Sequence, residues 1–449
     1  MATTETKPGN GKKINLPSAE DLTWSWSPRS ERESGDAIVT NFFLHWFPAK
    51  ISKRSIATSY SFWLGTISAI LFLILILTGV ILMFFYVPSV ERAYQSVKDI
   101  EYAISFGRYL RALHRIAAHL MVAVVFLHMV RVFLTGAYKN GLFARQNRPL
   151  NWWIGLAMLL STLLLSFTGY LLPWDQLAYW AITVGTNIAK AAPLVGEQLR
   201  FFLLGGHEIG QNTLIRFYVL HCFFIPAFLT MLFLWHMWRI RKDGGLACDD
   251  NLALNQKAQD AKPATSKTYS LLGITSGRTA HVEAALVDED KHQVSSVPNL
   301  LKRLLIVGLL TFAVSSLFAV LLGSPLEEAA NPFVTPNPAK APWYFLWLQE
   351  LVTITTIHIG KFTVNGAFIG GILVPGILLL WGIAQPLLDR SSAAATGVWF
   401  HPERKIHNAV FIAVCALVIV LTVVGTYLRG PYWHFFWPWE AWPVHPPRF

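Results

Sequence analysis

The chain has 449 residues, of which 53% are hydrophobic and only 14% are charged. A mean hydropathy of +0.42 lies outside the usual range of soluble globular domains and excludes that class. The formal net charge of +11 could suit nucleic acid, but in a membrane chain an excess of Lys and Arg marks loops that face lipid headgroups. We therefore expect membrane lipid as a partner, and no nucleic acid.

The N-terminal segment is polar. Its opening stretch, "MATTETKPGNGKKINLPSAEDLTW", has no apolar region next to a basic start. It therefore lacks the pattern of a cleaved signal peptide. We expect residues 1–54 to form a cytoplasmic segment.

Stretches free of Asp, Glu, Lys and Arg predict seven membrane-spanning helices. They are residues 55–90, 116–130, 149–174, 217–238, 304–326, 362–388 and 406–428. All but the second reach the roughly 20 residues that a helix needs to cross a bilayer. The second is short, and we expect Arg115 and Arg131 at its ends to extend outward. The chain is therefore predicted to be an all-α, multi-pass integral membrane protein.

Basic loops predict the orientation of the spans. Lys139, Arg145 and Arg148 lie in the acid-free loop between spans two and three, and Arg239 and Arg241 follow span four directly. Such clusters of Lys and Arg mark cytoplasmic loops. With seven spans, the N-terminus is expected inside and the C-terminus outside.

The spans fall into two blocks. Residues 55–243 hold four spans and residues 301–449 hold three, while residues 244–300 form a polar cytoplasmic linker with little helical periodicity. The outer loop between spans five and six is rich in Pro and aromatic residues, and we interpret it as the wall of a small-molecule pocket. The aromatic tail "RGPYWHFFWPWEAWPVHPPRF" suits an anchor at the membrane interface.

The cysteines carry no motif. Cys222, Cys248 and Cys415 are scattered without CxxC or CxxCH spacing. The sequence therefore predicts no disulfide framework, zinc site or covalent c-type haem.

Four histidines repeat at matched positions inside two spans. His114 and His128 are fourteen residues apart in span two, and His221 and His236 are fifteen apart in span four. At about 100° per residue, each pair shares one helix face and is separated by roughly 21 to 22 Å of rise. Because spans two and four run in the same direction, His114 should face His221 and His128 should face His236. Facing imidazoles at two levels predict two b-type haems with bis-histidine ligation.

Glycines repeat with the same period on the alternating spans. Gly65 and Gly79 lie in span one, and Gly155 and Gly169 lie in span three, fourteen residues apart in each case. Glycine would let a flat macrocycle approach the backbone at each level. Any one of these residues could instead serve helix packing, and a lone intramembrane histidine could simply bond to a neighbour.

Charged and kinking residues accompany the histidines. Arg111 and Arg115 bracket His114, and Arg131 lies about one turn beyond His128. Their guanidinium groups could pair with haem propionates, or extend to lipid headgroups. Pro226 should kink span four and so shape the space between the two levels.

Three stretches carry a family resemblance. "RALHRIAAHLMVAVVFLHMVRVFLTGAYK", "TGYLLPWDQLAYWA" and "GQNTLIRFYVLHCFFIPAFLTMLFLWHMWRIRK" closely resemble the cytochrome b/b6 family, the quinol-oxidising core of cytochrome bc-type complexes. The fifteen-residue histidine spacing resembles that of chloroplast-type members, whereas the mitochondrial pattern has fourteen. The second block resembles subunit IV, so the chain looks like a four-helix haem-binding bundle fused to three further transmembrane helices.

Two departures from the family are visible. The resemblance implies an outer Pro-Glu-Trp-Tyr tetrad whose Glu accepts a proton from the quinol, but this chain has Ala341, Pro342, Trp343 and Tyr344. We expect Trp343 and Tyr344 at the quinol site. The replacement acceptor is predicted among nearby residues: Glu350 is our hypothesis, with His358 and Asp175 as alternatives. Photosynthetic-type members attach an extra haem to a Cys in span one, and the matching residue here is Trp63, so no covalent third haem is expected.

The resemblance implies a function. The chain is expected to be the di-haem cytochrome b subunit of a proton-translocating quinol:cytochrome c oxidoreductase, with quinol and quinone as substrates. A Rieske-type iron–sulfur protein, a cytochrome c-like subunit and a homodimeric core are the implied partners. The bacterial cytoplasmic (inner) membrane is the expected location. Two alternatives remain: a haem-bearing anchor that passes electrons between a dehydrogenase or hydrogenase and quinone, and a transporter with a histidine proton relay.

Overall fold

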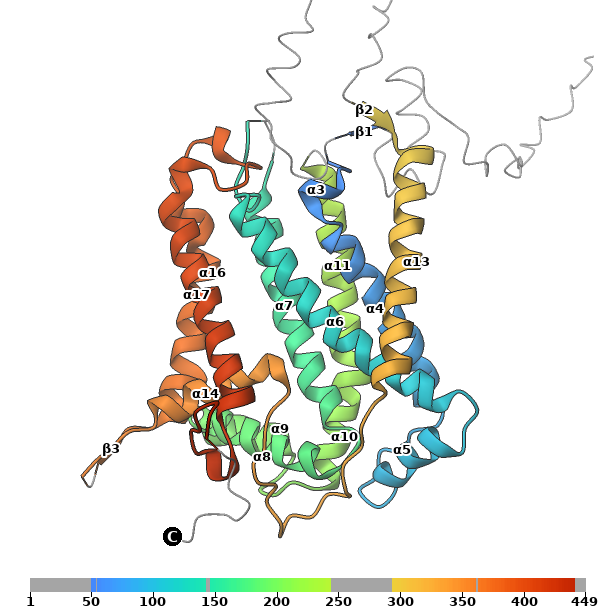
Figure 1. The fold of residues 1–449 in the computed structure, drawn as a ribbon, viewed down its shortest axis with the longest axis vertical. Helices are drawn as coiled ribbons and strands as arrows, with labels where there is room; N and C mark the ends of the chain where they lie inside the picture. Colours follow the sequence, from blue (N-terminus) through green and yellow to red (C-terminus); the bar gives the residue numbers. More distant parts are fainter. Residues whose placement is uncertain (1–49, 54, 143–145, 244–292, 361, 441–449) are drawn as a thin grey trace, which may run out of the picture.

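The structure is a computed structural model that describes residues 50–53, 55–142, 146–243, 293–360 and 362–440 (Figure 1). Most of the predicted cytoplasmic segment 1–54, most of the linker 244–300 with Cys248, and the last part of the tail lie outside the described residues.

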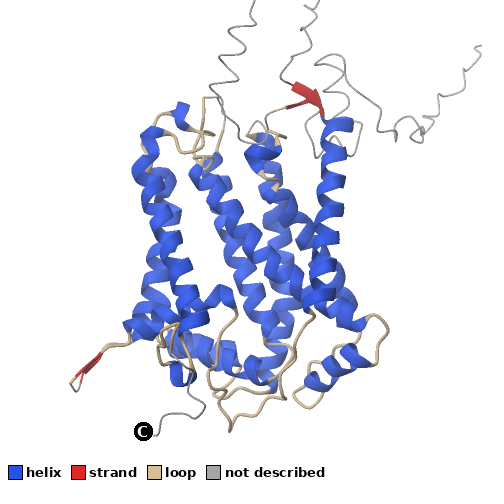
Figure 2. Cartoon of the chain, viewed as in Figure 1, coloured by secondary structure: helices blue, strands red, loops and turns tan. Residues whose placement is uncertain are grey.

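Seven membrane-spanning helices are present in the described part of the chain, as the sequence predicts. They are α4 (Leu64–Met83), α6 (Gly107–Leu134), α7 (Arg148–Tyr170), α10–η1–α11 (Gln211–Val219, Leu220–Phe224, Ile225–Lys242), α13 (Ser296–Leu322), α15–η3–α16 (Gly366–Phe368, Ile369–Leu373, Val374–Leu388) and α17–η6 (Lys405–Val423, Val424–Leu428). Figure 2 shows how completely helix dominates the fold. The chain is an all-α integral membrane protein.

The second span differs from its predicted length. Helix α6 has 28 residues, whereas the charge-free stretch gave only 116–130. The extra turns contain Arg108, Arg111 and Arg115, and two of these arginines bond to carbonyl oxygens of the loop after α13. Because protein groups satisfy these guanidiniums, a charge-free window underestimates the helix.

Shorter elements lie at the two ends of the spans (Figure 1). The end called outer here, after the predicted topology, carries α5 (Ala93–Tyr102), α8 (Gln176–Lys190), α9 (Gly196–Leu204), α14 (Trp343–Thr355), the ribbon β3–β4 (His358–Ile359, Phe362–Thr363) and η7 (Pro431–Trp433). The inner end carries α3 (Thr58–Ser61), η4 (Ala393–Ala395) and η5 (Pro402–Arg404). There β1 (Lys50–Ser52) pairs antiparallel with β2 (Gln293–Ser295), with Ile51 opposite Val294.

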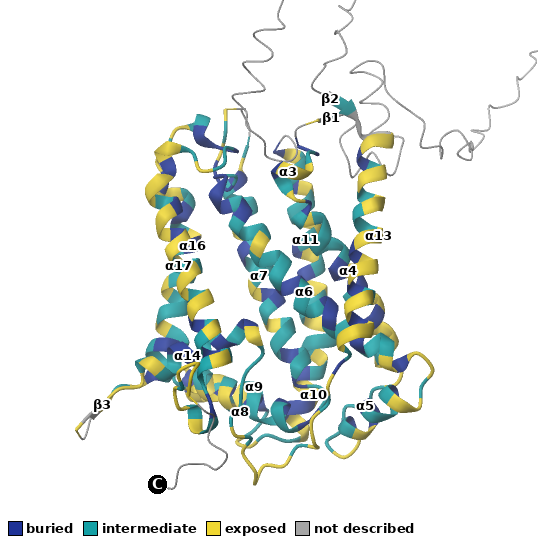
Figure 3. Ribbon diagram, viewed as in Figure 1, coloured by how far each residue is buried: buried dark blue, intermediate teal, exposed yellow. Residues whose placement is uncertain are grey.

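The spans pack into two joined groups. Helices α4, α6, α7 and α11 form the bundle, α13 lies against α4 and α6, and α16 contacts α7 while α14 contacts α17. Figure 3 shows many exposed residues along α13, α16 and α17. Leu309 and Leu380 are examples of exposed apolar side chains there, as expected for helices whose surroundings are lipid.

A buried ionic cluster joins the two groups at the inner end. Arg404 Nε donates to Asp389 Oδ2 at 2.9 Å, and Tyr138 Oη donates to the same oxygen at 2.5 Å. Arg404 also donates to the carbonyl oxygens of Phe133 and Leu134 at the end of α6. We call Asp389, Arg404 and Tyr138 the inner clamp, because it ties the α16–α17 connection to the α6–α7 connection.

Candidate haem and quinol site

Span four is not a continuous α-helix where it carries His221. Residues Leu220–Phe224 form a π turn, in which the N–H of Ile225 bonds to the carbonyl of Leu220. Pro226 follows at once and has no N–H to bond to the preceding turn. A π turn inserts one extra residue into an α-helix. The fifteen-residue spacing of His221 and His236 therefore keeps the helical register of a fourteen-residue spacing, and the predicted effect of Pro226 takes the form of this turn.

His114 and His221, the outer pair, face each other across the bundle. Their ring centroids are 6.2 Å apart and their planes are inclined at 76°. Two imidazoles that bind one metal ion from opposite sides have centroids about 6 Å apart, because each metal–nitrogen bond is about 2 Å long. The separation of the outer pair fits a single ion between the rings.

Hydrogen bonds orient the outer pair. His114 Nδ1 lies 2.8 Å from Thr78 Oγ1, and His221 Nδ1 lies 3.2 Å from Thr168 Oγ1 and 3.1 Å from the Leu165 carbonyl oxygen. Partners on Nδ1 fix the ring orientation and leave Nε2 as the nitrogen for a metal. Both hydroxyls come from the helices that carry the predicted glycines.

Each predicted glycine faces one predicted histidine. A Cβ at Gly79 would lie 3.2 Å from His114 Cε1, and a Cβ at Gly169 would lie 2.4 Å from His221 Cε1. At the inner level, a Cβ at Gly65 would lie 3.3 Å from His128 Cε1, and a Cβ at Gly155 would lie 3.8 Å from His236 Cε1. Gly169, Gly79 and Gly65 therefore make room for the imidazole rings, whereas a Cβ at Gly155 would be in ordinary contact; the predicted room for a macrocycle stays a prediction.

His128 and His236, the inner pair, lie nearer the inner end. Both residues are intermediate in exposure. Their glycine neighbours are Gly65, which faces His128, and Gly155, which faces His236. The structure thus brings His114 and His221 together, and the pairing of His128 with His236 stays a prediction.

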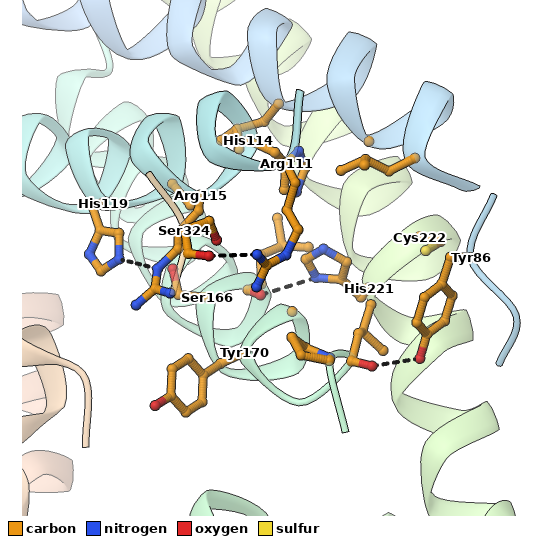
Figure 4. Close-up of a pocket in the computed structure, with 18 of the residues that line it drawn as sticks. Tyr86, Arg111, His114, Arg115, His119, Ser166, Tyr170, His221, Cys222 and Ser324 are labelled. Atoms are coloured by element: carbon orange, nitrogen blue, oxygen red, sulfur yellow. Dashed lines mark hydrogen bonds between the residues drawn. The ribbon is translucent and has the colours of Figure 1, made fainter. Parts of the chain in front are cut away.

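A cavity of about 320 Å³ is lined by the outer pair itself, together with Gly79 and Gly169, and extends from there to Tyr344. Figure 4 shows the histidines, arginines and tyrosines that converge on it. Its polar lining includes Arg111, Arg115, His119, Tyr170, Asp175 and Tyr344, together with Glu327. Most of the remaining wall is aliphatic and aromatic, as is typical of a site for a largely apolar small molecule.

The three predicted arginines have different surroundings. Arg111 pairs with Glu101 at 2.8 Å and donates to the Ser324 carbonyl. Arg115 donates from Nη1 to the Pro325 carbonyl at 3.0 Å. Arg131 is buried, and its guanidinium lies 4.7 Å from the centroid of the Tyr60 ring. Of the three, Arg111 and Arg115 line the cavity.

Glu350 is not where the proton-acceptor hypothesis needs it. It is fully buried and bonds to Arg429 through both carboxylate oxygens, while Trp433 Nε1 donates to Oε2 at 3.1 Å. It faces η6 and η7 and does not line the cavity. These contacts tie α14 to the segment that follows the last span. His358 is exposed on β3 and bonds to Thr363.

Two of the other predicted quinol-site residues, Tyr344 and Asp175, line the cavity, whereas Trp343 only bonds to His119, which does. Tyr344 lines it, and burial raises the pKa of Tyr344 above its usual value. Trp343 is partly exposed and donates from Nε1 to His119 Nδ1 at 3.0 Å. Asp175 is buried and also lines the cavity; its Oδ1 accepts from the Ala178 N–H at 2.9 Å and caps α8.

Several residues of the site were not predicted from the sequence. His119 lines the cavity one turn beyond Arg115, and Glu327 lines it from the loop after α13. Glu101 and Arg429 are the ion-pair partners of Arg111 and Glu350. His119 had a signal: it is a third histidine on the helix face that carries Arg115. The ion pairs join residues ten and seventy-nine positions apart, so no local pattern marks the longer one.

The seven spans define a multi-pass membrane protein, and the family models describe the two blocks of the chain. Residues 50–244 match the family model "Cytochrome b/b6/petB", and residues 329–437 match "Cytochrome b(C-terminal)/b6/petD". Cytochrome b6 of Synechococcus sp. (strain CC9311) is 38% identical over 210 residues, which are 44% of this chain and 94% of that protein. Cytochrome b6 of Auxenochlorella protothecoides is 37% identical, with 44% and 95% covered.

A solved structure shares the fold. A chain of "Hyperthermophilic respiratory Complex III" superposes with a TM-score of 0.64 at 23% identity, covering 84% of this chain and 86% of that chain. From the family models and the relatives, the chain belongs to the cytochrome b/b6 family, in a form that fuses a b6-like block to a subunit IV-like block. It is an electron-transfer subunit of a cytochrome bc-type complex, and b-type haem is the cofactor that the family implies.

Proposed function

We propose that the chain binds two b-type haems and oxidises quinol at the outer end, with electrons crossing toward a quinone at the inner end and with net proton translocation. The separation of 6.2 Å between the rings of the outer pair carries this proposal. The inner pair supplies a second level on the same two helices, fourteen residues further along one and fifteen along the other.

The residues present fit haem at the outer level. His114 and His221 would ligate the iron through Nε2, since Nδ1 of each ring already has an oxygen partner. His128 and His236 would do so at the inner level. Bound haem would supply one-electron chemistry at potentials set by its two axial ligands and by burial.

Haem would occupy the part of the cavity between His114 and His221, and the part lined by Asp175 and Tyr344 is the proposed quinol site. Its size and apolar wall suit a quinone ring, and Tyr344 and Trp343 bring the second block to it. One electron from each quinol would leave to a Rieske-type iron–sulfur partner, and a cytochrome c-like subunit would follow. A homodimeric core and the bacterial cytoplasmic membrane, with the N-terminus in the cytoplasm, are part of the same proposal.

Asp175 is the proposed proton acceptor in place of Glu350. Burial raises the pKa of Asp175, even though the backbone N–H groups of Ala178 and Glu327 donate to it. A carboxylate with a raised pKa gives and takes protons closer to neutral pH than an exposed one does. Asp175 also lines the cavity that Glu350 does not reach.

The proposal is tested with membranes that contain the whole complex. Pyridine haemochrome quantitation should give two b haems per chain, and quinol should reduce them by a route that outer-site inhibitors block. A haem count of one or none would refute the two-level arrangement. Reduction through the inner end alone would instead support the anchor that conducts electrons without quinol oxidation outside.

The proton acceptor is tested by a matched pair of variants. Asp175→Asn keeps an oxygen for the α8 cap and should lower quinol oxidation at least about tenfold with haem content unchanged. Glu350→Gln should leave the rate per haem unchanged. Equal rates for Asp175→Asn and the unaltered chain would remove Asp175 from the mechanism.

A further inference from the structure

We propose that Arg115 and His119 form a two-donor site for one oxygen atom of the quinol or quinone in the outer cavity. This rests on the proposed function and deepens it, because it names how the substrate would be held. The observation behind it is a surplus of hydrogen-bond donors around a single imidazole ring, His119, on the wall of the cavity.

Two N–H groups point at the two nitrogens of His119. Trp343 Nε1 donates to Nδ1 at 3.0 Å, and Arg115 Nε is directed at Nε2 at 3.5 Å. Indole and guanidinium N–H groups are donors only, while a neutral imidazole has one nitrogen that accepts and one that carries a proton. The ring can therefore accept one of these two hydrogen bonds and not both.

The distances decide which bond is made. The contact of 3.0 Å with Trp343 is a normal N–H hydrogen bond, whereas 3.5 Å is beyond the usual range. Nδ1 is then the acceptor and Nε2 carries the proton, an assignment made from the hydrogen-bond network. Trp343 in this way fixes the tautomer of His119 and acts as a positioning residue.

The consequence is two N–H donors side by side without an acceptor between them. Arg115 Nε–H and His119 Nε2–H start from nitrogens 3.5 Å apart. One oxygen atom can accept from both at about 2.9 Å. Arg115 stays in place while it does so, because its Nη1 is held by the Pro325 carbonyl.

The chemistry of the two donors selects the oxygen. One donor belongs to a permanent cation, and hydrogen bonds from charged donors are stronger to an oxygen that carries negative charge. A quinone carbonyl or a deprotonated quinol oxygen meets this description, and the apolar cavity wall suits the ring that carries it. A carboxylate of bound haem has the same oxygen chemistry, so the experiment has to distinguish the two sources.

Three variants in complex-containing membranes test the site. His119→Phe removes the donor and keeps a ring, His119→Gln keeps an N–H donor, and Trp343→Phe removes the hydrogen bond that fixes the tautomer. The readouts are direct binding of the short-chain benzoquinone decylubiquinone, KM and kcat for its quinol, and the haem content and midpoint potentials.

We expect His119→Phe to weaken decylubiquinone binding and raise KM by about tenfold, since a hydrogen bond to a polar acceptor is lost. His119→Gln should retain binding within about threefold, and Trp343→Phe should give an intermediate loss. Haem content and midpoint potentials should not move in any of them.

Each other outcome overturns the proposal in a recognisable way. A shifted outer midpoint potential with unchanged quinone binding assigns the two donors to a haem carboxylate. Unchanged binding with unchanged potentials shows that the donors hold neither. Because binding is measured without turnover, a chain that binds decylubiquinone through His119 but does not oxidise its quinol would refute the proposed function and leave this site standing.

Discussion

Two polar clusters of this membrane protein, one at each end of α6, contain similar residues and differ in how completely they are bonded. At the inner end, the carboxylate of Asp389 and the guanidinium of Arg404 are fully buried and bond to each other, to Tyr138 and to backbone carbonyls. At the outer end, Arg115 Nε lies 3.5 Å from His119 Nε2 at the edge of a cavity, and in the proposed tautomer neither N–H has an acceptor in the protein. The inner cluster, whose hydrogen-bonding groups have partners within the protein, joins two groups of helices. The outer cluster has N–H groups left to bind a ligand.

The difference teaches how to separate structural from functional charges in a membrane interior. A charged group whose donors and acceptors are all used has no hydrogen bond to offer a substrate. Glu350 with Arg429 is a saturated pair too, although it lies at the outer end near the proposed quinol site. Position near a cavity is therefore a weaker guide than unused hydrogen-bonding capacity.

The inner clamp should show the largest effect. Replacing Arg404 with Leu leaves Asp389 as a buried charge without its main partner and should cost about 3–5 kcal/mol of stability. Thermal unfolding of the detergent-solubilised protein measures this, with Lys405→Ala at an exposed neighbour as the control. A loss equal to that of the control would mean that the clamp does not hold the two groups together.

The two glycine levels should respond differently to one methyl group. Gly169→Ala puts a Cβ 2.4 Å from His221 Cε1, in a ring that is held by hydrogen bonds, whereas Gly155→Ala puts it 3.8 Å from His236 Cε1. Gly169→Ala should lower the haem content of the outer level several-fold, and Gly155→Ala should preserve the inner level. Optical redox titration resolves the two. An equal loss of haem in both variants would contradict the idea that the distance between the new Cβ and the imidazole decides the effect.

The pair of Glu350 and Arg429 should matter for stability and not for catalysis. Glu350→Gln removes the negative charge but keeps an oxygen for Arg429 and an acceptor for Trp433, so about 1.5–3 kcal/mol of stability should be lost. Thermal unfolding and the quinol oxidation rate per haem are measured on the same sample. A rate that falls while the unfolding temperature stays constant would restore a catalytic role to Glu350.

The smallest effect concerns the pH dependence of the inner clamp. Burial alone would raise the pKa of Asp389, but hydrogen bonds from Ser391, Tyr138 and Arg404 outweigh it and hold the pKa well below its usual value. A depressed folded-state pKa stabilises the protein above the unfolded value of about 3.9, and this stability is lost as the pH falls from there toward the folded-state pKa. Unfolding midpoints measured through acidic pH should therefore fall less in Asp389→Asn than in the unaltered chain.

Periodic features were predictable from the sequence and long-range partners were not. The seven spans and the pairing of His114 with His221 follow from charge-free length and helical period, which act locally. The ion pair of Glu350 with Arg429 depends on how α14 packs against η6, and nothing local encodes that. The pairing of Glu350 with Arg429 could not be predicted for this reason, and a catalytic role for Glu350 stays a prediction.

Because of the π turn at His221, the number of residues between the two histidines of this helix does not give the number of helical turns between them. Removing one residue from Leu220–Phe224, for example Cys222, would let the turn relax into ordinary α-helix while His221 and His236 kept their faces. Cytochromes whose histidines are fourteen apart and those whose histidines are fifteen apart can then hold their rings in the same places. An insertion or deletion of that one residue changes the helix only at the π turn. The number of helical turns between the two histidines stays the same.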